Sequence, residues 1–101
     1  MHRFSNIKFR YNPEKNTKLI EDRGIGFDEI ANAMTGGNVI AVTEHFNKEK
    51  YPNQKVAYVS VLDKVYVVPY IEEDKDFIFL KTAYPSSKAR DLLIFNDKNK
   101  R

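Results

Sequence analysis

Residues 54–83 decide the fold: Gln54–Leu62 reads QKVAYVSVL, Lys64–Ile71 reads KVYVVPYI and Asp76–Ala83 reads DFIFLKTA. All three stretches are rich in β-branched and aromatic residues, which favour strands. Little more than Asp63 separates the first two stretches, so we expect them to pair as a hairpin. The acidic turn at residues 72–74 leads into the third strand. These stretches therefore predict an antiparallel meander, around which the rest of the chain is organised.

Pro69 lies within the second of these strands, where it cannot donate a hydrogen bond to a neighbour. Such a proline is compatible with an edge position or with a β-bulge. We favour a bulge at Pro69, because an edge position would deprive the neighbouring strands of their simplest partner.

The first half of the chain predicts one strand and two helices. Residues 7–11 alternate apolar and basic side chains, as a half-buried strand does. Asn12 and Pro13 begin a helix that runs to about residue 23, where Gly24 provides a left-handed stop. A second helix is expected over residues 28–34. Its apolar stripe predicts core packing and consists of Phe27, Ile30, Ala31 and Met34.

The remaining elements complete an α+β pattern. We expect a strand at residues 39–43, an exposed loop at 44–53, and a last helix at 87–95 with Ser86 as its cap. The predicted order is β-α-α-β-β-β-β-α. It favours an α+β fold, with a twisted, mainly antiparallel sheet and the helices packed on one face.

Composition indicates a single globular domain over residues 1–101, with flexible ends at 1–6 and 96–101. The chain has 42% hydrophobic and 31% charged residues. No apolar run approaches the roughly 18 residues of a membrane span, and residues 1–10 lack the apolar region of a signal peptide. The absence of cysteine excludes disulfides and fits a reducing cytosol, so we expect a cytoplasmic protein.

Positive charge is concentrated at the two ends of the chain. Residues 1–20 hold five Lys/Arg against one Glu, and residues 81–101 hold six Lys/Arg against two Asp. Residues 21–80 hold six Lys/Arg against eleven Asp/Glu. If folding brings the ends together, they form one basic face suited to phosphate. Charged, solvated chain ends would give the same pattern.

Two short motifs resemble the opening of the BrnT family of toxins. They are Tyr11-Asn12-Pro13-Glu14-Lys15 and, eight residues later, Arg23-Gly24-Ile25-Gly26-Phe27-Asp28-Glu29-Ile30-Ala31. The spacing from Pro13 to Phe27 matches without a gap, and the order of elements resembles the family over about residues 7–93. The chain departs from the family at Asn12, Leu19 and Arg23, and it lacks the Arg-rich stretch after the last strand.

The resemblance implies a fold similar to that of the RelE ribonucleases. It also implies the toxin of a type II toxin–antitoxin pair, which cleaves RNA without a metal or another cofactor. An antitoxin protein, of ribbon-helix-helix or similar DNA-binding type, would hold the toxin inactive. The pair would bind operator DNA only as a complex.

Metal-independent RNA cleavage needs a base for the ribose 2′-OH, cations on the phosphate and an acid for the leaving oxygen. The candidate catalytic residues are Lys81, Tyr84, Lys88, Arg90 and His45. The candidate RNA-binding residues are Lys15, which the family position implies, together with Lys8, Arg10 and Arg23. No motif for a metal site or for another catalytic class is present.

Each candidate also has a plain structural interpretation. A lone histidine in a loop, such as His45, is more often a solvated surface residue. Lys81 is unusual on local grounds, because it is in phase with Phe77 and Phe79 on one face of a strand. Two further functions stay open. The chain could be an interaction module that has lost catalysis and binds an antitoxin-type partner, or a toxin of the same fold that acts on a protein.

Overall fold

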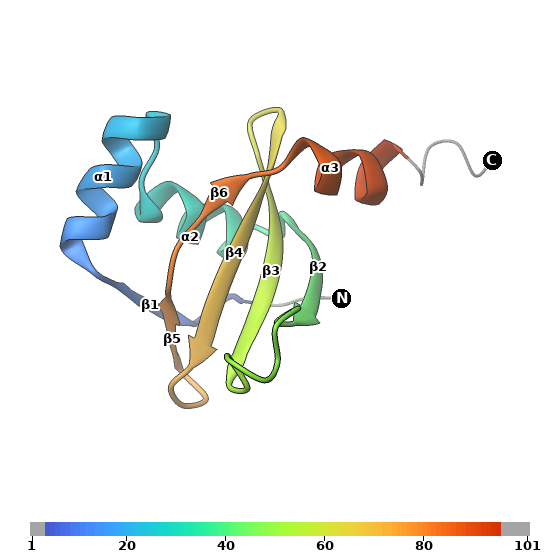
Figure 1. Cartoon of the computed structure of the whole chain (residues 1–101). Helices are drawn as coiled ribbons and strands as arrows, with labels where there is room; N and C mark the ends of the chain where they lie inside the picture. The colour runs from blue at the N-terminus through green and yellow to red at the C-terminus, as the bar shows by residue number, and fades with distance from the viewer. Residues whose placement is uncertain (1–3, 96–101) are drawn as a thin grey trace.

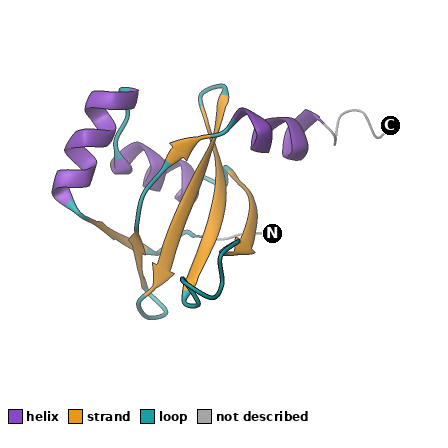
Figure 2. Cartoon of the chain, viewed as in Figure 1, coloured by secondary structure: helices purple, strands orange, loops and turns teal. Residues whose placement is uncertain are grey.

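The computed structural model describes residues 4–95, and its centre is the predicted hairpin (Figures 1 and 2). Strand β3 (Gln54–Val61) pairs with β4 (Lys64–Glu72) in one continuous antiparallel register, from Gln54 opposite Ile71 to Val61 opposite Lys64. The turn between them is Leu62-Asp63. Leu62 has a positive φ of 54°, which is uncommon for a residue with a branched apolar side chain.

The prediction of a β-bulge at Pro69 is wrong. Pro69 lies opposite Val56 with no shift in the register between β3 and β4. Its carbonyl oxygen accepts a hydrogen bond from the N–H of Lys81, at 2.9 Å, on the side away from β3. The N–H and C=O of a strand residue point toward the same neighbour. The missing N–H of Pro69 therefore faces residues 81–83, which form no strand, so no ladder hydrogen bond is lost.

The sheet is mixed, with the strand order β1-β5-β4-β3-β2. Strand β1 (Lys8–Tyr11) is parallel to β5 (Phe77–Leu80), whereas β2 (Val39–Glu44) pairs antiparallel with β3. The strand predicted over residues 76–83 is shorter than expected and consists of β5 alone, because residues 81–83 form no strand. A short strand that was not predicted, β6 (Tyr84–Pro85), follows them. Strands β5 and β6 both pair antiparallel with β4, on the side of β4 away from β3, and the segment between them leaves an interruption in the sheet. The bulge in this sheet lies in β2, between Val39 and Ala41.

Two helices join the core on one face of the sheet, and the first of them does so through Leu19. Helix α1 (Pro13–Arg23) is capped by the side chain of Asn12, and Gly24 closes it with a φ of 80°. Helix α2 (Phe27–Thr35) buries Phe27, Ile30 and Met34 of the predicted stripe, whereas its fourth member, Ala31, is only half-buried. The core cluster joins this stripe to Leu19 of α1 and to sheet residues of one face, namely Ala57, Val59, Tyr66, Val68 and Tyr70.

The last helix lies on the opposite face, so the prediction that all helices pack on one face is wrong. Helix α3 (Ser87–Arg90) continues into the π-helical turn η1 (Asp91–Phe95), within the range predicted for this helix. Ala89 packs in a second cluster with Val56, Val65 and Val67. Successive strand residues point to opposite faces, so Val65 and Val67 point away from α2. The fold is α+β with helices on both sides of the sheet.

The prediction of a flexible lead-in at residues 1–6 is wrong for Phe4. Phe4 is buried, and its ring meets that of Tyr70 edge-on, with centroids 6.0 Å apart. Residues 1–3 and the predicted flexible tail at 96–101 lie outside the described residues. Among the described residues, no helix has the length and apolar character needed to cross a bilayer.

Candidate functional site

The interruption between β5 and β6 opens a pocket of about 340 Å³, which we call the central pocket. It is lined by Lys15, His45, Phe46, Tyr51, Gln54, Pro69, Lys81, Thr82 and Tyr84. Four of these, namely Lys15, His45, Lys81 and Tyr84, are residues that the sequence predicts for the site. No Asp or Glu is among the described residues that line the pocket. Two lysines without a carboxylate favour an anionic ligand.

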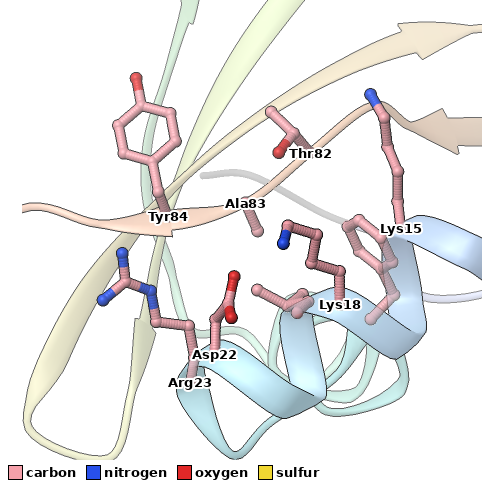
Figure 3. Close-up of a pocket in the computed structure, with 9 residues that line it drawn as sticks. Lys15, Lys18, Asp22, Arg23, Thr82, Ala83 and Tyr84 are labelled. Carbon is pink, nitrogen blue, oxygen red and sulfur yellow. The ribbon is translucent and has the colours of Figure 1, made fainter.

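Helix α1 places Lys15 at this pocket. Its ammonium Nζ donates a hydrogen bond to the main-chain oxygen of Lys81, at 3.3 Å, although the two residues are 66 positions apart. Figure 3 shows the Lys15 side chain reaching toward the segment that carries Thr82, between β5 and β6. The position of the helix is fixed from its other side, because the side-chain oxygen of Asn16 accepts the N–H of Phe27 at 2.7 Å. The predicted meeting of the N-terminal and C-terminal basic segments is therefore confirmed for Lys15 and Lys81.

Lys81 has two environments. It lines the central pocket, and its Nζ lies 5.3 Å from the centroid of the Phe79 ring. An aromatic face attracts a cation and also covers the aliphatic part of its side chain. The alternation of side chains that puts Lys81 on the same face as Phe79 therefore also puts it at the rim of the pocket.

His45 is buried, with only 7% of its surface exposed, so its interpretation as a solvated loop residue is wrong. Its ring packs against the rings of Phe46 and Tyr51, at centroid distances of 4.4 and 4.6 Å. The Nδ1 atom accepts the N–H of Asn47 at 3.0 Å. An accepting Nδ1 carries no proton, so the neutral ring holds its proton on Nε2. His45 can therefore donate a hydrogen bond through Nε2.

The prediction of an exposed loop at 44–53 is confirmed at most of its residues, but His45 is buried and Tyr51 is half-buried. The N–H of His45 donates to the oxygen of Gln54 at 3.1 Å, which continues the β2–β3 ladder beyond β2. The N–H of Tyr51 donates to the oxygen of Asn47 at 2.9 Å. These bonds bring His45, Tyr51 and Gln54 to one wall of the central pocket.

Tyr84 lies where three cavities meet, and 38% of its surface is exposed. Burial raises the pKa of its hydroxyl above the ordinary value, and the nearby Tyr58 raises it further. The Tyr84 hydroxyl therefore stays protonated at neutral pH and can donate a proton or a hydrogen bond. In Figure 3 its ring points away from the residues of α1.

A second cavity, the α1 cleft, adjoins the central pocket and has a volume of about 260 Å³ (Figure 3). Lys15, Thr82 and Tyr84 line both cavities. The α1 cleft also contains Arg23, a predicted RNA-binding residue, but Asp22 is beside it and offsets part of its charge. The cleft also contains Lys15 and Lys18, so its formal charge equals that of the central pocket. The two cavities differ because the central pocket has no carboxylate among its described lining residues and contains His45.

The other predicted residues lie elsewhere. Lys88 lines a groove under α3 that also contains Tyr84. Arg90 lines a separate cavity with Lys64, and its guanidinium contacts the Asp91 carboxylate at 3.2 Å. Lys8 and Arg10 flank the ring of Phe77 on β1 and β5, at 5.6 and 4.7 Å from its centroid. Arg10 also approaches Glu73 at 3.6 Å.

Sequence reasoning missed Tyr51, Gln54 and Thr82, which all line the central pocket. The sequence predicts a strand at Gln54 and an exposed loop at Tyr51, and nothing in their local pattern indicates a site. The available signal is that β2 and β3 are consecutive strands, because consecutive strands usually pair and an antiparallel pair returns residue 54 beside residue 45.

Comparisons of the chain with family models, with curated proteins and with solved structures gave no match.

Proposed function

We propose that this chain is a toxin-type RNA endonuclease that uses the central pocket without a metal, on a RelE-like fold. One observation carries the proposal. Lys15 and Lys81 meet at a pocket that also holds His45 and Tyr84, and none of the described residues lining it is acidic. This set combines two cations with two neutral donors, as stabilisation of a phosphorane requires. The family resemblance of the sequence points to the same class of reaction.

The proposed reaction is attack of a ribose 2′-oxygen on the adjacent phosphorus. A bond forms between the 2′-oxygen and phosphorus, and the bond from phosphorus to the 5′-oxygen breaks, which leaves a 2′,3′-cyclic phosphate and a 5′-hydroxyl. Lys15 and Lys81 offset the charge that develops on the non-bridging oxygens. The hydroxyl of Tyr84 gives its proton to the leaving 5′-oxygen, and Nε2–H of His45 donates to the phosphate.

The described side chains of the pocket offer no evident base for the 2′-OH. Lys15 and Lys81 are cations, Tyr84 is protonated, and His45 uses Nδ1 to accept the N–H of Asn47. We therefore assign the 2′-OH proton to hydroxide or water from solvent. The cleavage rate then rises with pH through the neutral range, whereas a histidine base would give a plateau above its pKa.

The first experiment uses the purified chain, a single-stranded RNA and excess EDTA. We expect products with 2′,3′-cyclic phosphate ends, identified by mass spectrometry, and loss of cleavage in Lys81→Ala. His45→Gln places an amide nitrogen close to the position of Nε2 and should retain more activity than His45→Ala. Cleavage that proceeds equally in wild type and Lys81→Ala would contradict the proposed site.

The biological part of the proposal is inhibition by a partner. A DNA-binding antitoxin would cover the cationic pocket, and the complex would bind operator DNA. Expression of the chain in the cytoplasm without its partner should break down RNA and arrest growth of the cells. Lys81→Ala should relieve this arrest. Growth arrest that is unchanged in Lys81→Ala would argue against RNA cleavage at this pocket.

A second candidate is an interaction module that has lost catalysis. Arg90 favours it, because this cation contacts Asp91 and lies outside the central pocket. A pocket without that arginine has fewer cations for the phosphate. Tight binding of an antitoxin-type partner, with no cleavage at any protein concentration, would support this function and exclude the first.

A further inference from the structure

A groove of about 560 Å³ lies between α3 and the sheet, and we call it the α3 groove. Three aromatic residues from different parts of the chain line it, namely Phe46, Tyr58 and Tyr84. Phe46 is 72% exposed although its ring is large and apolar. An exposed aromatic wall beside a cavity indicates a place where a ligand can bind.

The sheet register arranges two of these rings. Tyr58 of β3 lies opposite Val67 of β4, and Val67 lies opposite Tyr84 of β6. Directly opposed residues share a face, and neighbouring strands are about 4.8 Å apart. The two tyrosines therefore stand on either side of Val67, about 10 Å apart at their backbones. The result is a slot with aromatic walls and an aliphatic floor.

Polar groups lie around this slot. The Ser86 hydroxyl oxygen accepts the N–H of Ala89 at 3.0 Å, which leaves its own hydrogen free to donate. Thr43 adds a second hydroxyl and Lys88 adds a cation, and both side chains are exposed. Flat apolar walls with hydroxyls nearby are what a nucleobase needs, because its faces stack and its edge forms hydrogen bonds.

The α3 groove adjoins the central pocket. Tyr84 and Phe46 line both cavities, so a ligand in one is in contact with the walls of the other. The groove also has no Asp or Glu among its described lining residues, which suits a polyanion. One nucleotide can thus place its phosphate against Lys15 and Lys81 and its base in the groove.

We propose that the α3 groove is a nucleobase subsite, in which one base of single-stranded RNA stacks between Tyr58 and Tyr84 while its phosphate lies in the central pocket. This inference rests on the proposed function and adds to it a site that recognises the base of the RNA. Stacking on an aromatic side chain contributes about 1–3 kcal/mol per base. Removal of the base should therefore weaken binding by about tenfold to a hundredfold.

The experiment measures binding of a 2′-O-methyl trinucleotide, which has no free 2′-OH and cannot be cleaved, and of the same compound with an abasic central position. Titration calorimetry or NMR gives both dissociation constants for the full chain. We expect the intact compound to bind wild type at least tenfold more tightly than the abasic one. Tyr58→Ala should remove this difference, Tyr58→Phe should keep it, and Ser60→Ala, on the same strand but outside the groove, should leave it unchanged. Because Tyr58 is half-buried, Phe46→Ala at an exposed position provides a second variant that should reduce the difference.

Equal binding of the intact and abasic compounds to wild type would overturn the nucleobase inference and leave the phosphate site intact. Failure of both compounds to bind would overturn the proposed RNA function itself. If Tyr58→Ala weakens binding of a protein partner while the two RNA affinities are equal, the groove accepts a partner segment and the inference is wrong.

Discussion

Replacement of Lys15 by alanine gives the most direct test of the central pocket, because this residue reaches the site only through the tertiary fold. Two unit charges about 4 Å apart interact by about 4 kcal/mol at an effective dielectric constant of 20. Lys15 is exposed, so solvent screens part of this energy, and we take about half of it. About 2 kcal/mol of lost transition-state stabilisation corresponds to a roughly 30-fold slower cleavage.

Lys18→Ala is the matched control for Lys15→Ala. It removes the same charge from the same helix, but Lys18 lines the α1 cleft and not the central pocket. The assay is single-turnover cleavage of a fluorescent RNA at saturating protein, with thermal unfolding measured in parallel. We expect a loss of about twofold or less for Lys18→Ala, and stability of both variants within about 0.5 kcal/mol of wild type. Equal losses of rate in the two variants would refute the reasoning, because they would show that only the overall charge of the helix matters.

Three further predictions concern stability. Burial, with a smaller effect of Glu72, raises the pKa of Tyr70 from 10.0 to about 12, so the unfolded chain ionises first as pH rises. The corresponding stabilisation, about 3 kcal/mol, is complete below pH 10 and is lost between about pH 10 and 12; denaturant unfolding should show this loss, and Tyr70→Phe should reduce it. Leu62→Asn should raise the melting temperature by a few degrees, which corresponds to about 0.5–1 kcal/mol. Leu62 is 84% exposed and has a φ of 54°, a conformation that asparagine tolerates better than leucine. An unchanged melting temperature would show that the positive φ of Leu62 costs no stability. Gly26→Ala should lower the free energy of unfolding by about 1–3 kcal/mol, because the added Cβ would lie 2.7 Å from the side-chain oxygen of Asn16 and 2.9 Å from Cγ1 of Ile20. Gly24→Ala is the control: its Cβ meets nothing within 4 Å, so any loss of stability there comes from the positive φ of residue 24 and not from crowding.

The sequence by itself determined the elements whose causes are local. Asn12, Pro13 and Gly24 fix the bounds of α1 because capping groups act within one helical turn. The stripe of α2 and the β3–β4 hairpin follow from periodicity and from the shortness of the turn. The sequence also determined which face of the strand Lys81 shares, because side chains alternate along a strand. These features depend on neighbours within a few residues.

Tertiary structure alone decided what these elements meet. Pro69 needs no bulge because the strand beside it is interrupted, and that interruption depends on residues 81–83. Helix α3 lies on the second face because α1 and α2 bury the first, and its own apolar residues do not specify a face. His45 is buried because its N–H bonds Gln54 of the next strand and the rings of Phe46 and Tyr51 pack against it. The contact of Lys15 with Lys81 spans 66 residues, and such a pairing arises only when packing of the whole domain fixes both segments.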